Sequence, residues 1–153
     1  MREKNIKLNG TKLDPMRKER YREKIEYILE ALDEIPEEPK RPIEVSGTFY
    51  NLLTSIESAM DVCAMLVKDL GRRVEDDYSN IEILHELGIL DKELAEKLKT
   101  CNGLRNWLVH RYNKLDKKIV LESVDKVRET LIEFIRRVEH VLETEHRGDQ
   151  KRA

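Results

Sequence analysis

The chain has few of the residues that stabilise a disulfide scaffold or a structural zinc site. Its 153 residues include only two cysteines, Cys63 and Cys101, which both fall at apolar positions and form no closely spaced pair. Isolated cysteines of this kind are typical of reduced packing residues in a cytosolic protein. We therefore expect no disulfide, no metal and no other cofactor.

Long apolar runs are also absent. No stretch approaches the roughly 20 apolar residues that span a bilayer, and the first residues lack the apolar core of a signal peptide. This pattern predicts a soluble, cytoplasmic protein that does not contact a membrane.

An excess of charge of either sign is missing as well. Lys and Arg number 29, Asp and Glu number 31, and the net charge is −2 although 39% of residues are charged. Such a balance provides no general field for a polyanion, so nucleic acid would have to bind a local basic patch. Candidate patches are Arg72 with Arg73, the group Arg111, Lys114, Lys117 and Lys118, and Arg136 with Arg137.

Glycine and proline are scarce, at six and four residues, and apolar residues recur at steps of three and four. This periodicity predicts amphipathic helices, and we find no strand alternation, internal repeat or glycine-rich phosphate loop. The expected fold is a single-domain, all-α, up-and-down bundle of four to five helices over residues 15–145, between a polar leader (1–14) and a polar tail (146–153). The first expected helix runs from Pro15 to Ile35, and the exposed connection Pro36–Pro42 follows it. The second runs from about Thr48 to Leu70 and is ended by Gly71, and the third runs from a capping box at Ser79 and Glu82 to Gly88. The fourth begins after a cap at Asp91 and extends through residue 112, and the fifth runs from about Ile119 to Glu143.

Arg105 interrupts the apolar seam of the fourth helix. A guanidinium stays charged at neutral pH and costs several kcal/mol to bury unless it is paired, so it requires a buried acid or an anionic ligand. Glu57 or Asp61 of the second helix could be that acid. Alternatively, Arg105 could hold a phosphate while His110 moves a proton, which would suffice for RNA cleavage without a metal, because RNA carries its own 2′-hydroxyl nucleophile.

Asn102, Asn106, His110 and Asn113 form a polar ridge beside this seam, and Tyr112 stands almost directly above Arg105 on an ideal helix. The same geometry places Arg105 and His110 about 140° apart. The two groups therefore converge only if the helix is distorted near its end or if two copies pool their groups across a dimer axis.

Residues 103–112, Gly-Leu-Arg-Asn-Trp-Leu-Val-His-Arg-Tyr, resemble the Arg-x4–6-His signature of the HEPN superfamily, and the Tyr two residues after the His resembles the HepT-like toxin branch. Residues 55–62 and 86–90 are similar to further segments of that family in the same order. The resemblance covers most of residues 21–142.

The resemblance implies a metal-independent endoribonuclease, the toxin of a toxin–antitoxin pair whose antitoxin is a minimal nucleotidyltransferase (MNT). In such a protein Arg105 would bind the scissile phosphate of the RNA substrate, His110 would act as acid or base, and Asn106 would orient the pair. Tyr112 would accept AMP from the antitoxin. Family members form homodimers in which two motifs face a shared cleft.

Two other interpretations remain. Glu82 with His85, and Glu143 with His146, have the spacing of carboxylate-bridged iron sites, but the further inward carboxylates such a site needs are not evident. The chain could also be a non-catalytic HEPN bundle that uses Arg105 to bind a nucleotide or the partner nucleotidyltransferase. Trp107 lies within the motif, and we expect it to pack rather than to stack on a base.

Overall fold

The computed structural model describes residues 13–110 and 116–150, with side chains described as far as Thr144 in the last helix, and all regular structure within these residues is helical. The described chain forms α1 (Pro15–Asp33), α2 (Pro42–Asp69), α3 (Asp77–Glu86), α4 (Lys92–His110) and α5 (Lys117–Gln150). The predicted all-α bundle is confirmed.

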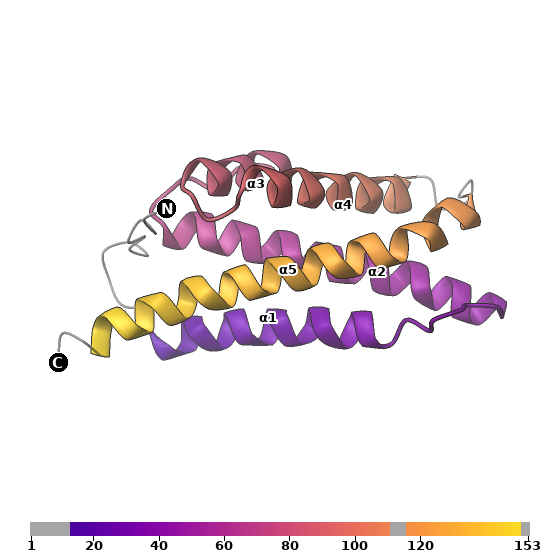
Figure 1. Ribbon diagram of the computed structural model, residues 1–153, viewed down its shortest axis with the longest axis horizontal. Coiled ribbons are helices and arrows are strands. Elements are labelled where there is room, and N and C mark those ends of the chain that lie inside the picture. Colours follow the sequence, from indigo (N-terminus) through magenta and orange to yellow (C-terminus); the bar gives the residue numbers. More distant parts are fainter. Residues whose placement is uncertain (1–12, 111–115, 151–153) are drawn as a thin grey trace.

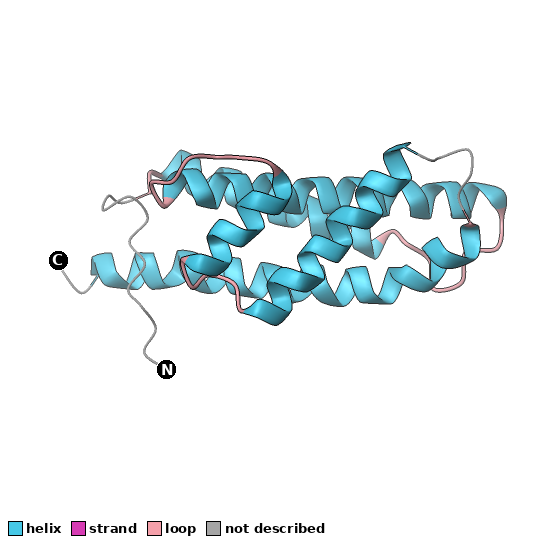
Figure 2. Ribbon diagram, turned by 90° about the horizontal axis from the view of Figure 1, so that it is seen from above, coloured by secondary structure: helices cyan, strands magenta, loops and turns pink. Residues whose placement is uncertain are grey.

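Helix α2 is the centre of the bundle, because it contacts each of the other four helices. Helices α1, α2 and α5 run lengthwise beside one another, and α3 and α4 form a second layer over them (Figure 1). Seen from above, α4 crosses the long helices obliquely (Figure 2). The α2 side chains Leu52, Ile56 and Leu66 are fully buried. The central position of α2 accounts for the burial of its side chains on several faces.

Several helix boundaries follow directly from local signals. Asp14 caps α1 by accepting a hydrogen bond from the Arg17 backbone N–H at 2.8 Å, and Pro15 occupies the first turn. Asp91 accepts from the Leu94 backbone N–H at 2.7 Å at the start of α4. Gly71, at φ 79°, lies in the left-handed region that ends α2. The caps predicted at these positions are confirmed.

The predicted start of the second helix is wrong, because α2 begins at Pro42 rather than near Thr48. Pro42 stands in the first turn, where a missing N–H costs nothing. The fifth helix is also longer than predicted and continues past Glu143 to Gln150.

The predicted capping box of the third helix is wrong as well. Asp76 caps α3, since its carboxylate accepts from the Ser79 backbone N–H at 2.9 Å. Glu82 instead forms an ion pair with Lys99 of α4 at 2.7 Å. The contact ties α3 to α4.

A polar cluster joins α1 to the end of α2. The Tyr21 hydroxyl, which is fully buried, donates to the Asp69 carboxylate at 2.5 Å, and Arg17 pairs with the same carboxylate at 2.9 Å. Burial, together with the hydrogen bond to Asp69, raises the pKa of Tyr21, so this hydroxyl stays protonated. One carboxylate therefore satisfies two partners on the neighbouring helix.

Replacing Asp69 with alanine is expected to lower the free energy of unfolding by about 3 kcal/mol, because it leaves a buried hydroxyl and a largely buried guanidinium without their acceptor. Urea unfolding followed by circular dichroism measures the change. Glu19→Ala is the control, since it removes an exposed ion pair with Arg22 and should change stability by at most about 0.5 kcal/mol. Equal stability of the two variants would contradict the prediction.

Candidate functional site

Arg105 is held in place on α4 by two neighbours. Its Nη2 donates to Glu57 Oε1 of α2 at 3.1 Å, and its Nη1 donates to Asn106 Oδ1 at 2.9 Å. The side chain is 29% exposed, so the guanidinium lies at the surface end of the apolar seam rather than within the core. Of the two acids expected from the sequence, Glu57 is the partner of Arg105.

Asp61, the other acid considered, is paired elsewhere: its carboxylate accepts from Lys24 of α1 at 2.9 Å. A carboxylate from α3 contributes instead to the surroundings of Arg105. Burial raises the pKa of the Asp77 carboxyl, the positive charge of Arg105 opposes the rise, and the charges of Asp61 and Glu57 add to it. Arg105 therefore lies within an acidic environment built from two helices.

Asp77 and Tyr78 of α3 were not identified from the sequence. The Tyr78 hydroxyl would lie 3.6 Å from a Cβ at Gly103, so α3 packs closely against the stretch of α4 that carries the motif. No local sequence pattern predicts the contact between Tyr78 and the Gly103 region, because it depends on how α3 and α4 cross.

His110 is the last residue of α4, and its side chain is exposed. Helix α4 is α-helical from Lys92 through His110. The two routes by which these groups could converge, a change at the helix end or a dimer, both stay predictions, since residues 111–115 lie outside the described residues.

The other polar residues of the ridge differ in their surroundings. Asn102 is 1% exposed, and its Oδ1 finds no hydrogen-bond partner among the described residues. The Nε of Arg105 is buried and likewise has no hydrogen-bond partner among the described residues.

Trp107 is partly buried against the core, which confirms its packing role. Tyr112 and Asn113 lie outside the described residues.

The residues of the alternative metal site have other contacts. Glu82 is paired with Lys99, and His85 Nδ1 lies 2.9 Å from the Leu90 carbonyl oxygen. The side chain of His146 lies outside those described. Over residues 13–110 and 116–144, no three His, Cys, Asp or Glu side chains are grouped so that they could hold a metal ion.

The basic patches are only partly available to a ligand. Arg137 of α5 donates to the carbonyl oxygens of Ile89 at 2.6 Å and Gly88 at 3.3 Å, so it stabilises the turn between α3 and α4. Exposed basic side chains remain at Arg72, Arg73, Lys117, Lys118 and Arg136.

Over the described residues, no helix is long and apolar enough to span a membrane.

Comparison with known proteins places the chain in a family. A family model described as "Ribonuclease HepT-like" matches residues 4–138. Two proteins of Archaeoglobus fulgidus, each named "Putative RNase", are similar to the chain: one is 75% identical over 128 residues, covering 84% of this chain and 97% of its own length, and the other is 38% identical, covering 79% and 95%.

Solved structures share the fold. A toxin–antitoxin complex with AMP-PNP contains a chain that matches with a TM-score of 0.68 and 21% identity, over 78% of this chain and 97% of that one. The tri-AMPylated Shewanella oneidensis HEPN toxin in complex with its MNT antitoxin yields a TM-score of 0.63 and 20% identity, over 84% of this chain and 99% of the other.

Proposed function

Because the chain belongs to the HepT-like ribonuclease family, we propose that it is the toxin of a toxin–antitoxin pair and cleaves RNA without a metal. The observation that carries the proposal is the fixed guanidinium of Arg105. Glu57 and Asn106 hold it at the surface, and the exposed His110 follows it on the same helix.

Arg105 would bind the scissile phosphate. A guanidinium has five N–H donors, and Glu57 and Asn106 accept from only two of them. Of the three donors that remain, the Nε N–H is buried, and the other two, on the Nη atoms, can stabilise the charge that develops on the phosphate oxygens as the bond breaks. Glu57 and Asn106 act as positioning residues, since they fix the plane of the guanidinium.

His110 would move the proton. Its imidazole takes the proton from the 2′-hydroxyl, the 2′-oxygen attacks phosphorus, and the bond to the 5′-oxygen breaks. A proton delivered to that 5′-oxygen completes the reaction and leaves a 2′,3′-cyclic phosphate and a 5′-hydroxyl. A homodimer would supply a second His110 for this last step, which one regular helix does not bring to Arg105.

The nucleotidyltransferase antitoxin would silence this site. The Tyr112 hydroxyl would attack the α-phosphate of ATP, form a phosphodiester with AMP and release pyrophosphate. The added group brings bulk and negative charge next to the phosphate-binding arginine, which would exclude RNA. Two observations support this assignment: Tyr112 stands two residues after His110, as in the motif that the chain resembles, and the similar Shewanella oneidensis HEPN toxin is tri-AMPylated.

The purified chain is expected to cut single-stranded RNA in buffer containing EDTA and to leave 2′,3′-cyclic phosphate ends, because the 2′-hydroxyl replaces an activated water as the nucleophile. Gel analysis with end-group labelling measures this. DNA of the same sequence is the control, since it lacks that hydroxyl and should stay intact. Cleavage of both substrates, or cleavage only with added divalent metal, would contradict the mechanism.

A second candidate function is favoured by the charges around Arg105. Glu57 already neutralises the guanidinium, and Asp61 and Asp77 add negative charge nearby, which opposes an incoming polyanion. A bundle of this kind could bind a nucleotide or the nucleotidyltransferase without cutting. That function predicts binding with unchanged RNA in the assay above.

A further inference from the structure

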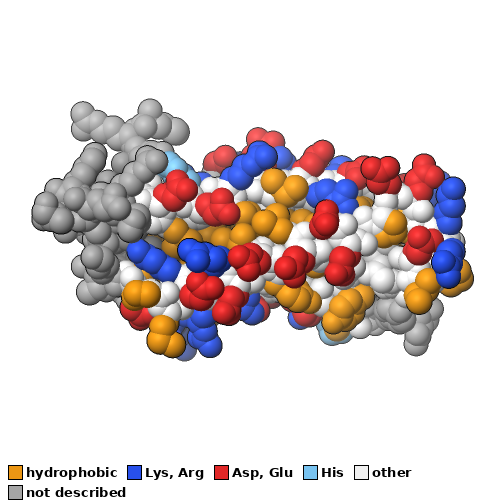
Figure 3. Space-filling view, turned by 90° about the horizontal axis from the view of Figure 1, so that it is seen from below, with side chains coloured by type: hydrophobic (Ala, Val, Ile, Leu, Met, Phe, Trp, Pro, Cys, Tyr) orange, Lys and Arg blue, Asp and Glu red, His pale blue; other side chains and the backbone are white. Residues whose placement is uncertain are grey.

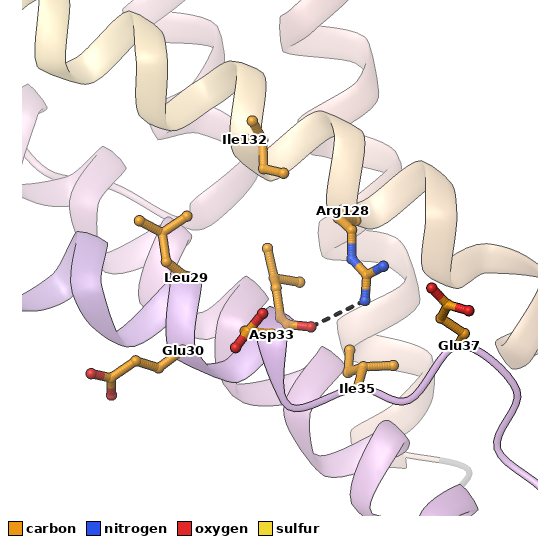
Figure 4. Close-up of a pocket in the computed structure, with 8 residues that line it drawn as sticks. Leu29, Glu30, Asp33, Ile35, Glu37, Arg128 and Ile132 are labelled. Carbon is orange, nitrogen blue, oxygen red and sulfur yellow. Dashed lines mark hydrogen bonds between the residues drawn. The ribbon is translucent and has the colours of Figure 1, made fainter.

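A cleft that does not include Arg105 lies between the C-terminal half of α1 and α5. The cleft encloses about 610 Å³ and is lined on its apolar side by Leu29, Leu32 and Ile35 of α1 and its end, and by Ile132 of α5. Leu29 is 43% exposed although it is one of the larger apolar side chains. Figure 4 shows Ile132 and Arg128 extending from α5, and Leu29 extending from α1.

The rim of the cleft is acidic. Glu30, Asp33 and Glu37 line it, and residues 25–39 as a whole contain six carboxylates and no lysine or arginine. Within the described part of the chain, Glu38 pairs with Lys40, and none of the three rim carboxylates forms an ion pair. In Figure 3, which views the molecule from the α1 side, carboxylates lie along a strip of apolar side chains.

This charge arrangement does not serve the stability of α1. A helix C-terminus carries partial negative charge and favours basic residues, yet the last turn of α1 has none. A cation is supplied there by α5: Arg128 donates to the Leu32 carbonyl oxygen at 3.1 Å, an acceptor that it shares with the Ile35 backbone N–H at 3.2 Å. The contact shows that a guanidinium can bind at this end of the cleft.

We propose that this cleft, with its rim of Glu30, Asp33 and Glu37, is a docking surface for a basic, amphipathic segment of a partner protein. Apolar side chains of that segment would cover Leu29 and Ile132, and its lysines or arginines would pair with the rim. The negative rim repels RNA and anionic lipid. It also disfavours a second copy meeting this face with its own, because carboxylates would then oppose carboxylates.

The test uses the full chain labelled with ¹⁵N and, as the probe, a synthetic helical peptide with leucines on one face and lysines on the other. Chemical-shift changes are expected at residues around Leu29, Arg128 and Ile132. The double variant Glu30→Gln/Asp33→Asn should weaken binding at least about 10-fold, whereas Glu38→Gln, outside the cleft lining, should leave it nearly unchanged.

The proposal would be overturned by the absence of binding, by shift changes spread over acidic sites elsewhere on the chain, or by equal affinity of the peptide for the chain and its double variant. A matched peptide with glutamates in place of lysines must not bind. Sedimentation of the unliganded chain tests whether a second copy of the chain binds this surface. Self-association that the double variant abolishes would show that a second copy occupies the cleft instead. None of these outcomes depends on RNA cleavage.

Discussion

Replacing His110 with alanine is expected to lower metal-independent RNA cleavage by at least about 100-fold, the range of effect that a positioned general acid or base contributes. His110 is exposed at the end of α4 and is not part of the buried core. Its loss should therefore leave the fold and its thermal unfolding unchanged. The initial rate of cleavage of a labelled RNA in EDTA measures the effect.

A matched control is available in the same chain. His140 is an exposed histidine of α5, so His140→Ala removes an imidazole outside the motif and should retain the rate of the unaltered chain. Retention of full activity by His110→Ala would refute the assignment. His110 is a cleaner test than Arg105, because removal of Arg105 leaves the Glu57 carboxylate without its partner and so changes stability along with chemistry.

The dimer interpretation adds a further result to the same experiment. If one copy supplies Arg105 and the other His110, a mixture of His110→Ala and Arg105→Ala chains should recover part of the activity, because a mixed dimer contains one intact pair. Recovery would require exchange of subunits, which native mass spectrometry of the mixture can verify.

Much of the fold could be predicted from the sequence because helix stripes and caps are local signals. The apolar stripe of α1, from Tyr21 to Ile35, is buried as expected. Where the prediction failed, the local signal had more than one solution. Asp76 and Ser79 are both good caps three residues apart, and the chain uses Asp76. Pro42 is compatible both with an exposed connection and with a first helical turn.

The candidate site was predictable only in part. The unusual position of Arg105 on an apolar seam is visible in the sequence, and so is its need for an acid. The sequence does not show that Arg105 pairs with Glu57 rather than Asp61, because this depends on the ion pair that Lys24 of α1 forms with Asp61. Asp77 approaches through the crossing of α3 and α4, which no spacing in the sequence encodes.

Tyr112 is expected to be the acceptor of AMP, and its replacement by phenylalanine should abolish modification altogether, because phenylalanine has no hydroxyl to attack the α-phosphate of ATP. The test incubates the chain with its nucleotidyltransferase partner and ATP and measures the intact mass. The unaltered chain should gain one or more AMP groups and lose RNA cleavage in parallel. Tyr112→Phe should keep its mass and remain active when both proteins are present.

Tyr50 provides the matched control for this experiment. It is 62% exposed on α2, so exposure alone would make it a comparable target, and Tyr50→Phe should be modified like the unaltered chain. An AMP group on Tyr112 retains a negative phosphate, which would compete for Arg105 with the phosphate of RNA. Inhibition should therefore appear as lost RNA binding as well as lost cleavage. If Tyr112→Phe gains the same mass as the unaltered chain, the acceptor is a different residue.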